Sequence, residues 1–471
     1  MLAYQTNAQT LQYWDDNGIS PATDGTWDTT TTNWTGSATL SASTVPFTNG
    51  NFAIFAAGST TIPTLNINVP GTVSCEGIGN ATTSGGAASG APIQNLNIYG
   101  AGSITLPAGV WPFECGNVSS AYIIAVSVPI TGSGGLIQHN SGAIGLYGNN
   151  TYSGGTTATG GQIIYYNNNS SFGTGAITNT SGGTSLWCTN GPGDIVTLAN
   201  TFSLASGSTI NFVNGDTICS GPWTLLGSIT LKNASAPTTN LVISGAISGA
   251  SGAGVTLGTQ NGGTIILSGA NTFSGPTTIA LSGATATASI TSINSVSTPA
   301  QQANSSLGKP SSAANGVIAL GTTTYGGTMI YTGNGETSDR VINLTGTSGG
   351  GTIEMDGTGP LVLTSNVGAT GAGSKTLTLQ GSSTAANAIS GTITNNSSAN
   401  KTSLTKAGTG NWTLGGKSTF TGNLAINGGT LTINGSGYLG GGSYGGAISD
   451  VAGATFAYDS SSGSNACTLR G

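Results

Sequence analysis

Charged side chains are scarce in this sequence. Lys, Arg, Asp and Glu together make up 5% of the 471 residues, and Lys plus Arg number only 8. The formal net charge is −6, and there is no basic stripe that could neutralise phosphates or anionic lipid headgroups. The composition therefore argues against nucleic-acid binding.

Long apolar runs are missing as well. No run approaches the ~20 residues that a membrane-spanning helix needs, so we predict no transmembrane segment in this chain. The opening MLAYQTNAQT has no basic region followed by an apolar one, as a secretory signal peptide would. We expect that an export signal has been removed or that the sequence starts inside a larger protein.

Residues that bind metals are few and poorly placed for it. The single histidine, His139, lies in LIQHNSG, where we expect a turn or surface imidazole. The cysteines have no CxxC spacing, so we predict no metal site and no cofactor. We interpret them as isolated small core side chains, with one disulfide between neighbouring turns as the alternative; they are Cys75, Cys115, Cys188, Cys219 and Cys467.

Glycine and small polar residues are abundant instead. The chain holds 80 Gly, yet 36% of its residues are hydrophobic, and these gather in short β-prone clusters such as TIIL at 264–267 and TLTL at 376–379. Disordered chains are usually poor in Val, Ile and Leu and rich in charge, which is the reverse of this pattern. Many short strands separated by turns are therefore expected.

One sequence motif recurs along the chain. It reads LYGNNTYSGGTTA from Leu146, LSGANTFSGPTTI from Leu267 and LGGKSTFTGNLAI from Leu414, with an aromatic residue at Tyr152, Phe273 and Phe420. We expect these aromatics to be packed core or corner residues of a structural repeat. The alternative is an exposed platform on which carbohydrates stack.

A repeat unit of this size cannot fold alone. Ordering about 20 residues costs on the order of 20–40 kcal/mol of backbone entropy, while each buried Val, Ile or Leu recovers about 1.5–3 kcal/mol. Stacking the units at ~4.8 Å pairs their backbones and joins the inward side chains into apolar columns. The sequence therefore predicts an elongated all-β solenoid with corners rich in Gly, Asn and Ser, in which Gly supplies backbone with positive φ.

The first residues differ in composition from the rest. Residues 1–70 contain WDDNG and GTWDTTTTNWT, which we interpret as an N-terminal cap or first rungs, because large aromatics can cover the open end of a stack. A calcium loop is the alternative, although the spacing does not fit the helix–loop–helix consensus. Residues 71–471 are then the repeat region, which we expect to be truncated inside another repeat at NACTLRG.

The stretch LTKAGTGNWTLGGKSTFTGNLAINGGTLTIN at 404–434 resembles the autotransporter-associated β-strand repeat of bacterial surface proteins. Weaker copies begin near 146 and 267, and the segments at the N-terminus and at 305–363 are similar to parts of the same large proteins. This resemblance implies a right-handed parallel β-helix, exported as an adhesin-like passenger and placed at the cell surface or outside the cell. The family has no shared catalytic residues, and glycans, cell surfaces or further copies are its expected partners.

Catalysis on the same fold is the main alternative function. Polysaccharide lyases and hydrolases need clustered carboxylates, whereas the 14 acidic residues here are scattered. One group of charges, Asp339, Arg340, Glu354 and Asp356, could form a catalytic or calcium-binding set. We favour a structural ion pair, with Ile353 and Met355 facing inward and Glu354 and Asp356 facing solvent. A carbohydrate-binding module without catalysis is the third possibility.

Overall fold

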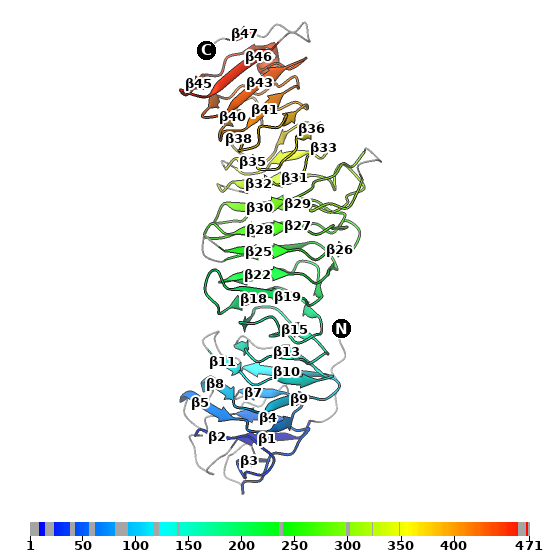
Figure 1. Ribbon diagram of the computed structural model, residues 1–471, viewed down its shortest axis with the longest axis vertical. Helices are drawn as coiled ribbons and strands as arrows, with labels where there is room; N and C mark the ends of the chain where they lie inside the picture. The colour runs from blue at the N-terminus through cyan, green and yellow to red at the C-terminus, as the bar shows by residue number, and fades with distance from the viewer. Residues whose placement is uncertain are drawn as a thin grey trace. The chain divides into compact units, whose positions relative to one another are not determined.

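The computed structural model describes residues 9–14, 23–37, 43–55, 62–80, 93–115, 122–138, 142–234, 239–297, 302–322, 324–347, 349–459 and 468–469. The chain forms two compact units, Met1–Pro222 and Trp223–Gly471. In each unit the strands lie one above another as successive rungs (Figure 1).

The first unit contains two long sheets and two short ones. One long sheet runs in the order β3 (Trp34–Thr35), β1 (Leu11–Trp14), β4 (Phe52–Phe55), β7 (Ile78–Asn80), β10 (Val110–Cys115), β13 (Gly135–Gln138), β15 (Thr156–Ala158), β17 (Ile177–Asn179), β20 (Phe202–Leu204). The other runs β2 (Gly25–Thr26), β5 (Ile62–Asn68), β8 (Ile93–Tyr99), β11 (Ile123–Val126), β14 (Ala143–Leu146), β16 (Gln162–Tyr166), β18 (Gly183–Cys188), β21 (Thr209–Val213). The short sheets are β6 (Thr72–Ser74), β9 (Ser103–Leu106), β12 (Ile130–Gly132), and β19 (Ile195–Leu198) with β22 (Asp216–Cys219).

The second unit repeats this plan with three longer sheets. The first runs β24 (Ile229–Asn233), β27 (Val255–Thr259), β29 (Thr277–Ile279), β31 (Ile318–Leu320), β34 (Ile342–Leu344), β37 (Gly368–Ala369). The second runs β25 (Asn240–Ile243), β28 (Thr264–Leu267), β30 (Ala286–Ile290), β32 (Gly327–Tyr331), β35 (Gly351–Met355), β38 (Lys375–Gly381), β40 (Thr402–Lys406), β42 (Leu424–Ile426), β45 (Ile448–Asp450).

The third sheet of this unit runs β33 (Glu336–Ser338), β36 (Leu361–Leu363), β39 (Ala388–Ile389), β41 (Asn411–Leu414), β43 (Thr430–Asn434), β46 (Thr455–Asp459). Two further pairs are β23 (Trp223–Leu225) with β26 (Ile247–Gly249), and β44 (Ser443–Tyr444) with β47 (Thr468–Leu469). One turn of 3-10 helix, η2, spans Gly440–Gly442.

The strand pairings that the structure describes are parallel, apart from the antiparallel pairing of β1 with β3. Inward residues alternate with outward ones, because successive side chains of a strand point to opposite faces. In the first unit one interior column of fully or nearly fully buried side chains passes through seven rungs: Leu65, Leu96, Ile124, Ile144, Ile164, Leu186 and Phe212. The predicted fold class, an all-β parallel β-helix, is confirmed.

Aromatic rings fill the interior near the start of the first unit. Trp34 and Phe47 lie 4.7 Å apart, and Trp14 meets Trp34 edge to face at 5.3 Å, with Trp27 and Phe55 completing the group. Asp15 and Asp16 lie outside the described residues. The interpretation of residues 1–70 as a cap stays a prediction.

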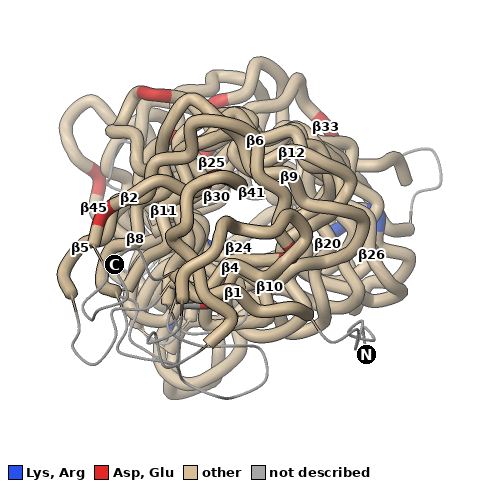
Figure 2. Tube along the Cα trace, turned by 90° about the horizontal axis from the view of Figure 1, so that it is seen from below, with Lys and Arg blue, Asp and Glu red and all other residues tan. Residues whose placement is uncertain are grey.

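Charged residues take up little of the trace, as the blue and red segments of Figure 2 show. Cys75, Cys188 and Cys219 are free and buried, and burial raises the pKa of the Cys75 thiol to about 12.

In the described part of the chain no group of three or more His, Cys, Asp or Glu could hold a metal ion. The same residues form no helix with the length and apolar character needed to cross a membrane.

Candidate functional site

The three aromatics of the recurring motif are fully buried. Tyr152, Phe273 and Phe420 each have 0% of their surface exposed, and the Tyr152 hydroxyl lies 2.5 Å from the Thr156 hydroxyl. A ring in this position cannot stack on a sugar from outside. The motif aromatics are therefore packed core residues.

The residue two places before each aromatic connects successive rungs. Asn150 Oδ1 accepts the main-chain N–H of Ile130 at 2.8 Å. Asn271 Oδ1 accepts that of Ile247 at 2.7 Å. In the third copy, Ser418 Oγ accepts from Ile393 at 3.2 Å.

The carbonyl groups of Ile130 and Ile247 are hydrogen-bonded as well. They accept the main-chain N–H groups of Tyr152 and Phe273, respectively. Sequence reasoning missed these polar residues, although their fixed place before the aromatic was visible.

The glycine after each aromatic is required by close packing between rungs. A Cβ at Gly154, Gly275 or Gly422 would fall 2.2–2.3 Å from backbone atoms of the preceding rung. None of the three has a positive φ, although their neighbour Gly155 does, at 86°. The expectation that motif glycine serves positive-φ corners is therefore wrong at these three positions.

The predicted charges at 339–340 surround an excursion of the chain. The described residues 291–297 and 302–317, which we call the 291–317 excursion, lie between β30 and β31 in the chain, and β33 with the residues that follow it contacts them. The Glu336 carboxylate accepts the N–H groups of Ile293 at 2.6 Å and Asn294 at 2.9 Å. The Asp339 carboxylate accepts those of Val296 at 2.5 Å and Ser297 at 2.7 Å. Burial raises the pKa of Asp339, but hydrogen bonds from Ser297 and Val296 outweigh it and the net pKa is lowered.

Arg340 holds the same excursion from inside. Its side chain is 1% exposed, and it donates to three main-chain carbonyls: Nε to Gly316 at 2.7 Å, and Nη1 to Leu307 at 2.8 Å and Ile293 at 3.2 Å. Burial lowers the pKa of Arg340 to about 9 despite the nearby carboxylates, so the guanidinium stays protonated at neutral pH. Its recorded hydrogen bonds go to carbonyl oxygens and so fix the backbone of the excursion.

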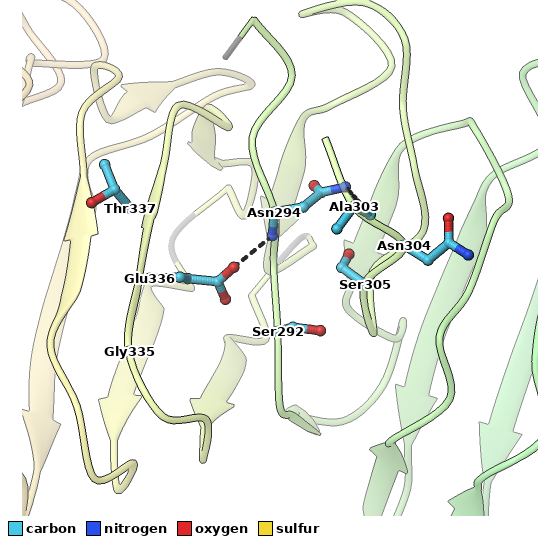
Figure 3. Close-up of a pocket in the computed structure, with 8 residues that line it drawn as sticks. All are labelled: Ser292, Asn294, Ala303, Asn304, Ser305, Gly335, Glu336 and Thr337. Carbon is cyan, nitrogen blue, oxygen red and sulfur yellow. Dashed lines mark hydrogen bonds between the residues drawn. The ribbon is translucent and has the colours of Figure 1, made fainter. Parts of the chain in front are cut away.

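A pocket of about 320 Å³ lies between the excursion and β33. Its lining is Ser292, Asn294, Ala303, Asn304, Ser305, Gly335, Glu336 and Thr337. Figure 3 shows Glu336 reaching across to the main-chain nitrogen of Asn294, with Ser305 and Asn304 on a separate segment. The one carboxylate in this lining is already held by two N–H groups, so the pocket offers polar contacts without an acid–base pair.

Glu354 and Asp356 do not line this pocket. Ile353 and Met355 are fully buried, which confirms the predicted alternation along β35. Glu354 accepts from Gln380 Nε2 at 2.7 Å, and Asp356 accepts from both the N–H and the hydroxyl of Ser382 at 2.9 Å. Asp339 and Arg340 follow β33, whereas Glu354 lies on β35 and Asp356 directly follows it, and these two strands belong to different sheets. His139 lies outside the described residues.

The pKa values of this acidic pair are shifted in opposite directions. Burial, and then the adjacent Asp356, raise the pKa of Glu354. The pKa of Asp356 is lowered, because the Ser382 hydrogen bonds outweigh the effect of burial. Two carboxylates with separated pKa values can serve as acid and base, but here each accepts a hydrogen bond from the next rung.

Lys406 is a buried charge that sequence reasoning overlooked. It lies in an interior column between Leu379 and Ile426, is 0% exposed, and donates to the carbonyls of Ala407, Gly408 and Gly428. Burial lowers the pKa of Lys406 to about 8. The sequence feature that could have indicated this role is Lys-Ala-Gly at the end of a strand, where the lysine ammonium can reach the carbonyl groups of the following turn.

Comparison with known proteins gives matches at the motif copies. The passenger-associated-transport-repeat family matches residues 136–163, 260–286 and 404–433, ranges that contain all three motifs. The adhesin BmaC autotransporter of Brucella suis biovar 1 (strain 1330) is 31% identical over 360 residues. The aligned region covers 72% of this chain and 9% of that protein, so the chain matches about a tenth of its relative's length. No solved structure matches the chain.

Proposed function

We propose that this chain, which belongs to the autotransporter passenger repeat proteins, is a non-catalytic, adhesin-like scaffold that works outside the cell. The observation that carries the proposal is the coincidence of the three family matches with the three motif copies. In each copy the distinctive side chains are used to join rungs.

The acidic residues support a scaffold more than an enzyme. Glu336 and Asp339 accept main-chain N–H groups, and Glu354 and Asp356 accept hydrogen bonds from Gln380 and Ser382 of the next rung. A hydrolase or lyase needs a carboxylate pair, or a carboxylate with a basic group, open to substrate along a groove. Polysaccharide cleavage remains the less favoured alternative.

The surface suits adhesion to neutral partners. With 5% charged residues, the outward positions of the rungs are mainly Thr, Ser, Asn and Gly. Such a surface offers many hydrogen-bonding groups and little long-range electrostatic attraction. Glycans, cell surfaces and further copies of the chain are the proposed partners, and the extracellular or outer-membrane surface is the proposed location.

Bead adhesion tests this function. Beads coated with the full chain should adhere to cultured epithelial cells or to a glycan-coated surface more than albumin-coated beads do. Because the surface is nearly uncharged, adhesion should change little between low and high salt. Failure to adhere to either surface would contradict the adhesive role, and release of new reducing sugar ends from a glycan surface would contradict the non-catalytic one.

A further inference from the structure

The outward face of the second long sheet in the first unit carries neighbouring aromatic rings. Tyr165 on β16 lies directly opposite Trp187 on β18, and their ring centroids are 5.8 Å apart. Their neighbours Ile164, Tyr166 and Leu186 are fully buried, so alternation directs Tyr165 and Trp187 outward, where both are partly exposed.

A third ring extends this pair to the preceding rung. Gly145 on β14 is the partner of Tyr165, and a Cβ at Gly145 would lie 2.7 Å from the ring of Tyr147. The Tyr147 ring therefore lies over Gly145 and occupies the place that a side chain there would take. Tyr147, Tyr165 and Trp187, which we call the aromatic strip, place one ring on each of three successive rungs.

The strip is partly open to solvent, and its polar tips have no hydrogen-bond partner within the part of the chain that the structure describes. All three side chains are partly exposed, and among the described residues no hydrogen bond involves either Tyr hydroxyl or the Trp187 indole N–H. Tyr and Trp combine an apolar face with a hydrogen-bonding tip, and buried examples usually find a partner for that tip. These tips are available to an external ligand.

The register column that contains Tyr165 and Trp187 carries no charge. Its outward residues run along the sheet as Asn66, Asn97, Ala125, Gly145, Tyr165, Trp187 and Val213. Asn97 Nδ2 donates to Asn66 Oδ1 at 3.0 Å, so the far end of the column is an amide ladder. Two rungs before Tyr147, Tyr99 at the end of β8 is 47% exposed.

We infer that the aromatic strip binds a neutral polysaccharide chain lying across the rungs. The ring centroids of Tyr165 and Trp187 lie 5.8 Å apart, close to the ~4.8 Å separation of the strands, so the rings follow one another along the stack, which fits a linear polymer better than a compact ligand. The faces contact the apolar sides of sugar rings, while the free tips and neighbouring amides bond to sugar hydroxyls. The uncharged column disfavours anionic polymers. This inference rests on the proposed adhesive function and names its ligand class.

Trp187 makes the strip measurable by fluorescence. The chain has seven Trp, all described, and six of them are buried: Trp14, Trp27, Trp34, Trp111, Trp223 and Trp412. Acrylamide quenching of the full chain therefore reports chiefly on Trp187. Dextran, galactomannan and soluble chitin oligomers are the neutral probes, and alginate is the anionic control.

At least one neutral polymer should protect the chain from quenching and retard it in affinity electrophoresis, whereas alginate should not. Trp187→Ala and Tyr165→Ala should each weaken the retardation about tenfold. Ile195→Ala removes a 60% exposed apolar side chain from another sheet of the same unit and should leave it unchanged.

Absence of neutral-polymer binding, or equal binding by Trp187→Ala, would overturn the inference. So would sedimentation showing self-association that Trp187→Ala abolishes, because the strip would then be an interface between copies. If the beads described above adhere and Trp187→Ala beads adhere equally, the adhesive function stands and this site fails. If no beads adhere, the quenching titration still tests the site.

Discussion

Asn271 Oδ1 accepts the main-chain N–H of Ile247 across two stacked rungs at 2.7 Å, while its Nδ2 donates to the Ser306 carbonyl at 2.7 Å. Both partners are distant in sequence. Asn271 is 0% exposed, so water cannot replace either bond. One side chain thus fixes the heights of the rungs on both sides of it.

Asn271→Ala should lower the free energy of unfolding by about 1–3 kcal/mol, because it leaves a buried N–H and a carbonyl without partners. Asn271→Ser should lose less, because Ser418 makes the equivalent acceptor contact in the third copy. Urea unfolding followed by circular dichroism measures both. The exposed Asn304→Ala is the control, and equal stability of all three variants would contradict the role of this residue.

Gly275→Ala tests the close approach between rungs. The added methyl would lie 2.3 Å from the carbonyl oxygen of Gly252, so rungs must separate or shift, at a cost of about 1–3 kcal/mol. Gly445→Ala is a matched control in the same unit, since nothing lies within 4 Å of its Cβ position and its φ is not positive. Similar thermal midpoints for the two variants would show that the rungs tolerate a side chain here.

Arg340→Met should release the 291–317 excursion. Three carbonyls each lose one hydrogen bond, and Arg340→Lys should restore little, because one ammonium cannot reproduce the planar fork of the guanidinium. Limited proteolysis should show faster cleavage within 291–317 in both variants. Glu354→Ala and Asp356→Ala, whose contacts are exposed or partly exposed, should change stability by only ~0–1 kcal/mol and leave the cleavage rate unchanged.

Glu114 should make the first unit more stable in acid. Its side chain is 2% exposed, Oε2 has no hydrogen-bond partner, and burial raises its pKa to about 7. The folded state therefore holds a proton that the unfolded chain releases at its lower pKa of 4.5, so stability falls as pH rises between 4.5 and 7. The loss should be about 3 kcal/mol, and Glu114→Gln should abolish it in denaturant titrations at several pH values. Parallel pH profiles for the two proteins would contradict this assignment.

The sequence predicted what depends on local pattern. Alternation of apolar and polar residues gave the strands, and the need to stack small units gave the solenoid. The burial of Phe273 followed from its place in a repeat. These properties follow from a residue and its near neighbours.

The partners of polar side chains could not be predicted in this way. Arg340 donates to Leu307 and Ile293, and Lys406 donates to Gly428. Each of these partners is set by the register of stacked rungs, which depends on the exact length of every intervening corner. The aromatic strip could not be predicted for the same reason. Tyr165 and Trp187 lie side by side only after β16 and β18 pair.

The excursion at 291–317 shows how such a protein can change its surface over evolution. Ala288 pairs with Met329, 41 residues later, whereas Met329 pairs with Ile353 after only 24, yet the ladder continues in register through both rungs. Extra length is absorbed at a corner, and the rungs before and after it keep their contacts. Insertions at the corners of this chain can therefore change its exposed surface while the stacked rungs, which carry the core, stay as they are.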